Sequence, residues 1–196
     1  MLDTHARKYV EPIIQKTAKQ LLRYNLTANQ VTVIAFAIGV SSGFFIYFQY
    51  TFVALALLWI SGFLDAVDGA MARLSRTSSP FGTVLDITFD RLVEISIIIG
   101  LALVYPDALL PLLILSVAII FSMTVFLTVG AVSEKAGMKS FYYQAGACER
   151  TEGFVLFSLM ILLPAYLNAI TLFYAAMVMF TGGQRLIEAY TILKKD

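Results

Sequence analysis

Long apolar runs separated by short polar links make up most of this chain. Six of these runs are long enough to cross a bilayer as helices of about 15 to 25 residues. They are predicted at residues 30–48, 51–73, 83–104, 109–132, 153–167 and 169–192. The link after the fourth run, residues 133–152, is too polar to enter hydrocarbon. The pattern therefore predicts an all-α integral membrane protein with six transmembrane helices.

Residues 1–26 follow a different pattern. Apolar and basic side chains recur there at helical spacing, which is typical of a basic amphipathic helix lying in the headgroup plane. The apolar stripe consists of Tyr9, Val10, Ile13, Ile14, Ala18, Leu21 and Leu22. A solvated helical tail is the alternative, but such a stripe needs a partner. We expect an interfacial helix and link (1–26) followed by a six-helix transmembrane domain (27–196), with Thr27 as a possible N-cap.

The composition agrees with a membrane protein. Of the 196 residues, 59% are hydrophobic and only 14% are charged, whereas about a quarter of a soluble domain is charged. The single cysteine, Cys148, excludes an internal disulfide framework. No cleavable signal peptide is expected, because the N-terminal region has no long apolar run and no small-residue cleavage site. With a net charge of +1, no nucleic-acid partner is expected.

The basic residues lie on one side of the predicted six-span arrangement. Both termini and the links after the second and fourth spans share this side, whereas the opposite links, near Tyr50, Asp107 and Asn168, contain no lysine or arginine. The residues on the basic side are Arg7, Lys8, Lys16, Lys19, Arg23, Arg73, Arg76, Lys135, Lys139, Arg150, Lys194 and Lys195. The positive-inside rule therefore predicts a multi-pass protein with both termini in the cytosol.

Four carboxylates, Asp65, Asp68, Asp86 and Asp90, lie inside the second and third runs. An acid in hydrocarbon is costly unless it is paired, metal-bound or facing a polar cavity, so four together indicate a functional site. Spacings of three and four residues put each pair on one helix face, and the turn residues between the pairs make the helices antiparallel. The two acidic faces can then meet. Four oxygen donors suit Mg²⁺ or Mn²⁺ better than zinc or copper.

These residues belong to a longer motif, D-x-x-D-G-x-x-A-R followed after eight residues by G-x-x-x-D-x-x-x-D. Its fixed positions are Asp65, Asp68, Gly69, Ala72, Arg73, Gly82, Asp86 and Asp90. The motif resembles the signature of the CDP-alcohol phosphotransferase family, integral-membrane enzymes that make phospholipids. The resemblance implies transfer of a phosphatidyl (phospho-alcohol) group from a CDP-alcohol such as CDP-diacylglycerol to an acceptor alcohol, with release of CMP. It also implies a homodimer in the cell membrane.

The family pattern implies a role for each aspartate. Asp65 and Asp86 would bridge two divalent cations, Asp68 would complete one cation site and Asp90 the other. Two such ions can clamp both phosphates and stabilise the leaving oxygen. Asp90 would also be the general base that takes the proton of the attacking hydroxyl.

The resemblance also implies a CDP-alcohol site between the start of the first span and the second helix. Its residues would be Asn29, Gln30, Val31, Thr32, Gly69, Ala72, Arg73, Ser79 and Gly82. An exposed helix N-terminus at Asn29 favours anions, although the family often has proline where this chain has Ala28. Two structural alternatives remain. Arg73 could mark the membrane boundary, and Ser79 could be only a turn residue.

The acceptor is less defined. A phosphorylated polyol requires cations beyond the metal site, and Lys135, Lys139, Arg150 and Arg185 could supply them. Arg150 lies in GACERTEGF, which is similar to a stretch of inositol-phosphate members, whereas TVGAVSEKAGMKS does not clearly match their arginine-bearing segment. Arg185 lies inside the last span, where Glu188 could pair with it. The acceptor is therefore inositol phosphate or glycerol phosphate, or alternatively a free alcohol such as serine or choline.

Two alternatives of other functional classes are a divalent-cation carrier that uses the same acids and a non-catalytic scaffold. A divalent-cation carrier would distribute carboxylates along a route through the membrane, whereas these gather near one face. A non-catalytic scaffold would not need an intact motif. The enzyme interpretation is therefore preferred.

Overall fold

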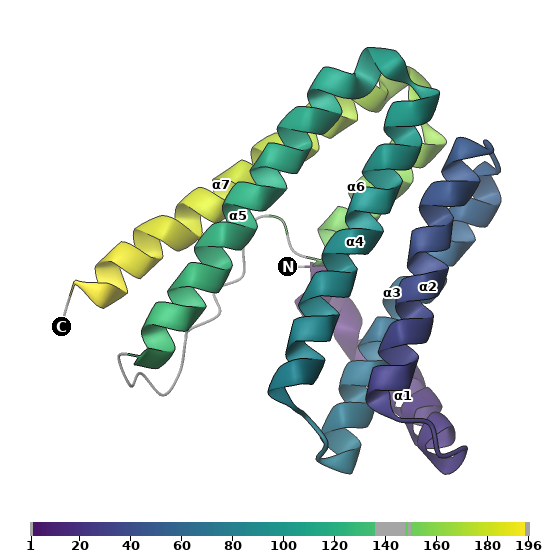
Figure 1. Cartoon of the computed structure of the whole chain (residues 1–196), viewed down its shortest axis with the longest axis vertical. Helices are drawn as coiled ribbons and strands as arrows, with labels where there is room; N and C mark the ends of the chain where they lie inside the picture. Colours follow the sequence, from purple (N-terminus) through teal and green to yellow (C-terminus); the bar gives the residue numbers. More distant parts are fainter. Residues whose placement is uncertain (1, 136–147, 149, 195–196) are drawn as a thin grey trace. The chain divides into compact units, whose positions relative to one another are not determined.

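The computed structural model describes residues 2–135, 148 and 150–194, and within these residues the chain forms only helices and the loops that join them (Figure 1). The α-helices are α1 (Leu2–Arg23), α2 (Ala28–Tyr47), α3 (Thr51–Ser75), α4 (Pro80–Val104), α5 (Leu109–Lys135), α6 (Arg150–Leu162) and α7 (Leu167–Leu193), and the short 3₁₀ helices are η1 (Pro106–Ala108) and η2 (Pro164–Tyr166). The all-α prediction is confirmed.

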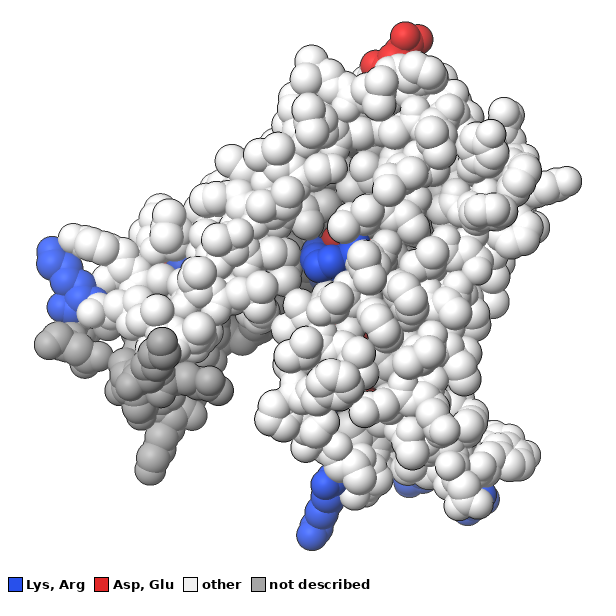
Figure 2. Space-filling view, in the orientation of Figure 1, with Lys and Arg blue, Asp and Glu red and all other residues white. Residues whose placement is uncertain are grey.

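Helices are present at all six positions where spans were predicted. Four segments are long and apolar enough to cross a membrane: Ala28–Tyr47, Thr51–Ser75, Pro106–Val132 and Pro164–Thr191. The helices at the other two predicted positions, α4 and α6, do not meet this description. α4 carries four charged residues, Asp86, Asp90, Arg91 and Glu94, and α6 has only 13 residues. The structure thus supports a multi-pass membrane protein, and the count of six spans stays a prediction. Most of the surface in view in Figure 2 is uncharged, as lipid contact requires.

The described chain divides into two compact units, Leu2–Pro106 and Asp107–Asp196. In the first unit, α2 packs against both α3 and α4, and α1 packs against α3. In the second unit, α7 packs against α5 and α6.

Small residues allow the close packing of α2. A Cβ at Gly43 would overlap the backbone carbonyl of Ser96 on α4, so only glycine fits there. On the side of α3, the hydroxyl of Ser42 donates to the carbonyl of Ala54 at 2.8 Å, and that of Ser61 donates to the carbonyl of Ala35 at 2.8 Å. The buried hydroxyls are therefore satisfied by backbone oxygens of the neighbouring helix.

The helix ends near the acids have clear sequence causes. Thr27 caps α2 in a capping box with Gln30, as the sequence predicted for Thr27. Ser79 caps α4 by accepting from the backbone N–H of Gly82 at 3.0 Å, and Pro80 begins the helix. α3 ends where Arg76 takes a left-handed conformation with φ 55°. The short turn makes α3 and α4 antiparallel, so the C-terminal part of α3 and the N-terminal part of α4 are neighbours.

The apolar stripe of α1 has a protein partner. Ile14 and Ala18 are buried in one cluster with Val31 of α2 and with Val67, Ala70 and Met71 of α3, and Leu21 and Leu22 pack against this cluster. The prediction that the stripe needs a partner is correct, but α3 provides much of it. Lys16, Lys19 and Arg23 are exposed. An interfacial position for α1 therefore stays a prediction. It is supported by the exposed basic side chains of Lys16, Lys19 and Arg23.

Candidate functional site

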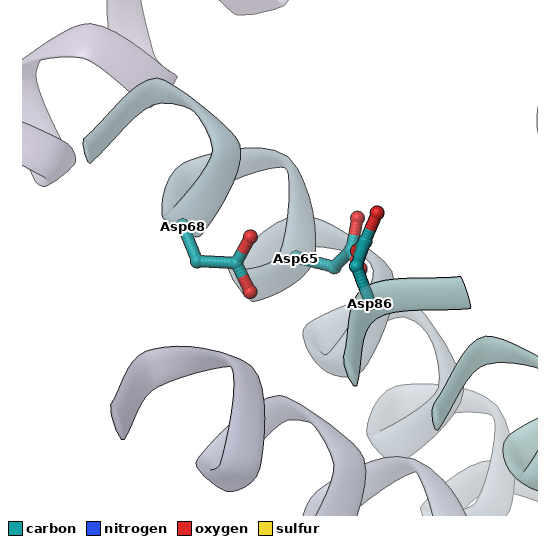
Figure 3. A group of neighbouring side chains, drawn as sticks. All are labelled: Asp65, Asp68 and Asp86. Carbon is teal, nitrogen blue, oxygen red and sulfur yellow. The ribbon is translucent and has the colours of Figure 1, made fainter. Parts of the chain in front are cut away.

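Three carboxylates meet between α3 and α4. Asp65 and Asp68 come from the C-terminal half of α3, and Asp86 comes from the N-terminal half of α4. Each offers an oxygen atom, and these three atoms lie within 4.8 Å of one another. Figure 3 shows the carboxylates of Asp65 and Asp86 side by side, with Asp68 pointing toward them from the next turn of α3. The predicted meeting of two acidic faces is therefore present for these three residues.

This group suits a hard divalent cation. Asp65 is 9% exposed and Asp68 is 5% exposed, so their charges are largely removed from water. Gathering three carboxylates in such a place is costly unless positive charge compensates them. All three donors are carboxylate oxygens, the ligands that Mg²⁺ and Mn²⁺ prefer. The donor set and its spacing therefore fit a metal centre.

Asp90 is not part of this group of three. It lies four residues after Asp86, which places it on the same face of α4 one turn further along the helix. Its side chain is half-buried. The group whose oxygens lie within 4.8 Å of one another is Asp65, Asp68 and Asp86, and the metal and base roles of Asp90 stay predictions.

Asn29, Ser79 and Gly82 lie close together at the N-termini of α2 and α4. A Cβ at Gly82 would lie 3.3 Å from Oδ1 of Asn29 and 3.2 Å from Oγ of Ser79. Two helix N-termini therefore adjoin at this point, and the free N–H groups and dipoles of both favour an anion. Ser79 has a structural role as well, because it caps α4.

The other predicted residues at the start of α2 use their side chains within the fold. Oε1 of Gln30 accepts from the backbone N–H of Thr27 at 2.9 Å, and the hydroxyl of Thr32 donates to the carbonyl of Ala28 at 3.0 Å. Val31 is 2% exposed in the cluster beneath α1. Each of these residues therefore has a structural role in the fold. Contacts of Gln30, Val31 and Thr32 with a ligand stay predictions.

On α3, Arg73 folds back toward the acidic part of the helix. Its Nη1 atom lies 3.4 Å from the position that a Cβ at Gly69 would take. Ala72 is half-exposed on the same helix. Since Gly69 directly follows Asp68, the guanidinium lies along α3 beside the acids rather than pointing straight away from the helix. This conformation suits the predicted pairing of Arg73 with a phosphate.

The predicted acceptor residues belong to the second unit. The guanidinium of Arg185 lies over the ring of Phe126 at 5.3 Å, and that of Arg150 lies over Phe154 at 5.9 Å. The Lys135 side chain and all of Lys139 lie outside the described residues. The acceptor role of these residues stays a prediction.

Arg91 and Glu94 of α4 were not among the predicted site residues. They form an ion pair with 2.6 Å between Nη1 and Oε2. The signal was available, because opposite charges three residues apart inside an apolar run indicate a paired, functional position.

A multi-pass helical protein with an acidic group between neighbouring helices has the architecture of an integral-membrane metal-site enzyme. This chain belongs to the CDP-alcohol phosphatidyltransferase family, whose sequence model matches residues 25–182. The family prediction is confirmed, and with it the assignment as a CDP-alcohol phosphotransferase of phospholipid biosynthesis.

Individual relatives agree with this family. The inner membrane protein YnjF of Escherichia coli is 31% identical over 203 residues, covering 99% of this chain and 98% of its own. The archaetidylinositol phosphate synthase of Methanothermobacter thermautotrophicus is 33% identical over 194 residues, covering 96% and 92% of the two chains.

A solved structure shares the fold. The phosphatidylinositol phosphate synthase of Mycobacterium tuberculosis with CDP-DAG bound matches with a TM-score of 0.74 and 25% identity, covering 92% of this chain and 94% of its own. The same enzyme was also solved with manganese and citrate, and that structure matches with a TM-score of 0.71 and 24% identity over 91% and 89% of the two chains.

Proposed function

We propose that this protein transfers the phosphatidyl (phospho-alcohol) group of a CDP-alcohol, such as CDP-diacylglycerol, to the hydroxyl of inositol phosphate and releases CMP. The observation that carries the proposal is the meeting of Asp65, Asp68 and Asp86, whose oxygens lie within 4.8 Å of one another. Such a group can bind divalent cations, and these cations in turn neutralise the charge of a pyrophosphate. An acidic motif without this convergence would not support phosphoryl transfer.

Two Mg²⁺ or Mn²⁺ ions are the proposed cofactors. Asp65 and Asp86 would hold both ions, Asp68 would complete one site and Asp90 the other. When bound, the ions would neutralise the pyrophosphate and stabilise the departing CMP. The manganese in the related mycobacterial enzyme agrees with this choice.

The pyrophosphate of the CDP-alcohol would lie near the adjoining N-termini of α2 and α4. Asn29, Ser79 and Gly82 line this point, and backbone N–H groups there can donate to phosphate oxygens. Arg73 lies beside Gly69 and would pair with a phosphate. Gly69, Ala72 and Gly82 would leave room for the nucleotide. Gln30, Val31 and Thr32 would contribute through the first turn of α2.

Asp90 is the proposed general base. Its carboxylate would take the proton of the acceptor hydroxyl as the hydroxyl oxygen attacks the lipid-bearing phosphorus. The bond from this phosphorus to the bridging oxygen then breaks, and CMP carries that oxygen away. The position of Asp90 one turn after Asp86, on the same face of α4, supports this role.

Inositol phosphate is proposed as acceptor because two of the relatives named above, the archaeal and the mycobacterial enzyme, are inositol phosphate lipid synthases. An anionic acceptor needs cations, which Lys135, Arg150 and Arg185 would supply. A free alcohol such as serine or choline would not need them.

The proposed setting is the cell membrane, with six spans and both termini in the cytosol. The proposed oligomeric state is a homodimer. The basic residues around the α3–α4 turn and at both ends of the chain support this orientation. In this setting the outer face of α1, with Lys16, Lys19 and Arg23, would lie against anionic headgroups.

The test is a CMP-release assay on purified protein with radiolabelled CDP-diacylglycerol and a panel of acceptors. We expect product with inositol phosphate, abolition by chelation of divalent cations, and restoration by Mg²⁺ or Mn²⁺. Product with serine, choline or glycerol phosphate, but none with inositol phosphate, would show that the alcohol giving product is the acceptor instead. No CMP release with any acceptor, together with Mn²⁺ uptake into liposomes, would favour a cation carrier instead.

A further inference from the structure

An ion pair lies directly beyond the acidic residues of α4. Nη1 of Arg91 and Oε2 of Glu94 are 2.6 Å apart, and the two side chains are 33% and 18% exposed. The contact has the distance of an ion pair but not the orientation of a hydrogen bond. Nε of Arg91 is buried and has no hydrogen-bond partner among the described residues. The ion pair with Glu94 therefore holds the guanidinium on this part of α4.

Stability alone does not explain this pair. The desolvation of two charges offsets much of their attraction, and an apolar pair of similar volume is often as stable or more so. The helix beyond the pair, residues 95–104, is apolar apart from Ser96. Two apolar side chains would match these surroundings. A charged pair at this position therefore calls for a role outside packing.

The position of the pair suggests that role. Asp86, Asp90 and Glu94 follow one another at intervals of four residues, so they share one face of α4. Arg91 directly follows Asp90, and its contact with Glu94 draws the guanidinium toward this face. A fixed positive charge thus lies within about one helical turn of Asp90.

We propose that Arg91 is a positioning residue of the acid site and that Glu94 is the anchor that holds it. The charge of Arg91 offsets the repulsion between Asp86 and Asp90, so that both carboxylates can stay ionised on the same face of α4. Between partly buried side chains, one fixed charge at this distance is screened less than it would be in bulk water. The proposal rests on the proposed function in one respect, namely that Asp90 completes a cation site.

The test replaces the pair by apolar residues in the full-length protein, Arg91→Met with Glu94→Met. Three quantities are measured: the unfolding midpoint in detergent, Mn²⁺ affinity by electron paramagnetic resonance without substrate, and CMP release. We expect an unfolding midpoint no lower than that of the wild type. The Mn²⁺ affinity of the weaker site should fall about tenfold, and CMP release at limiting Mn²⁺ should fall similarly. Arg91→Lys, which keeps the charge, should restore most of both, and Arg23→Met should change neither.

Wild-type Mn²⁺ affinity and wild-type CMP release in the double variant would overturn the proposal. If the double variant does not fold, Glu94→Gln decides, because it keeps the side-chain shape: an equal loss of Mn²⁺ affinity supports the proposal and no loss overturns it. Mn²⁺ binding by the wild type without CMP release would contradict only the proposed function, since the affinity comparison needs no turnover. Absence of any Mn²⁺ binding by the wild type would overturn both.

Discussion

The side-chain oxygen of Asn29 lies 3.3 Å from the position that a Cβ at Gly82 would occupy. This relationship joins the first turns of α2 and α4, which are separated in sequence by the whole of α3. Both helix N-termini carry partial positive charge, so their meeting supports the proposed site for the phosphates of the CDP-alcohol. The nearby acids then place this anion site beside the proposed metal centre.

Gly82→Ala should weaken substrate binding more than folding. The new methyl group would press on both Asn29 and Ser79 at 3.3 and 3.2 Å, and these oxygens must shift by a few tenths of an ångström. We expect KM for the CDP-alcohol to rise about threefold to tenfold, with a stability loss below about 1 kcal/mol. Steady-state CMP release over a range of CDP-diacylglycerol concentrations measures this. An unchanged KM would remove the α2–α4 junction from the nucleotide site.

Asp68→Asn should abolish metal-dependent turnover while keeping the fold. The amide matches the carboxylate in shape but lacks its charge, so the cation loses one of three gathered ligands. CMP release should fall by about a hundredfold or more, and Mn²⁺ binding should weaken in parallel. The matched control is Asp107→Asn, which removes an exposed acid in η1. Equal effects of the two substitutions would mean that Asp68 has no special role.

Gly43→Ala should destabilise the first unit. Its Cβ would overlap the backbone carbonyl of Ser96, and backbone of a packed helix cannot move away cheaply. A loss of about 1–3 kcal/mol is expected, visible as a lower unfolding midpoint in detergent. Gly130→Ala in α5 is the control, because among the described residues no atom outside its own stretch of helix lies within 4 Å of its Cβ position. That substitution should instead stabilise its helix by about 0.5–1 kcal/mol.

Ala18→Leu should disturb the proposed metal centre from outside it. Ala18 is fully buried against Val67, Ala70 and Met71, the residues of α3 that surround Asp68 in sequence. A larger side chain would push α1 away from α3, at a cost of about 1–3 kcal/mol. Both the unfolding midpoint and the Mn²⁺ affinity should fall, whereas Gln20→Leu on the exposed side of α1 should leave both unchanged. A normal Mn²⁺ affinity in Ala18→Leu would show that α1 does not support the acid-bearing helix.

The sequence by itself determined the helical class, the acid positions and the cap of α2. Apolar runs of this length have few stable alternatives to helices in a membrane, because every backbone polar group must be satisfied within the segment. The spacing of three residues between Asp65 and Asp68 puts both on one face of their helix whatever the details of packing. Thr27 caps α2 through contacts within three residues, which local sequence can specify.

Only the tertiary structure decided which surfaces meet. The stripe of α1 could equally have faced lipid, but Ile14 and Ala18 pack against α3. Asp90 shares a helix face with Asp86, yet it is not one of the three acids that gather. Helical periodicity fixes the direction of a side chain around its own axis, whereas the distance between two helices depends on every residue packed between them.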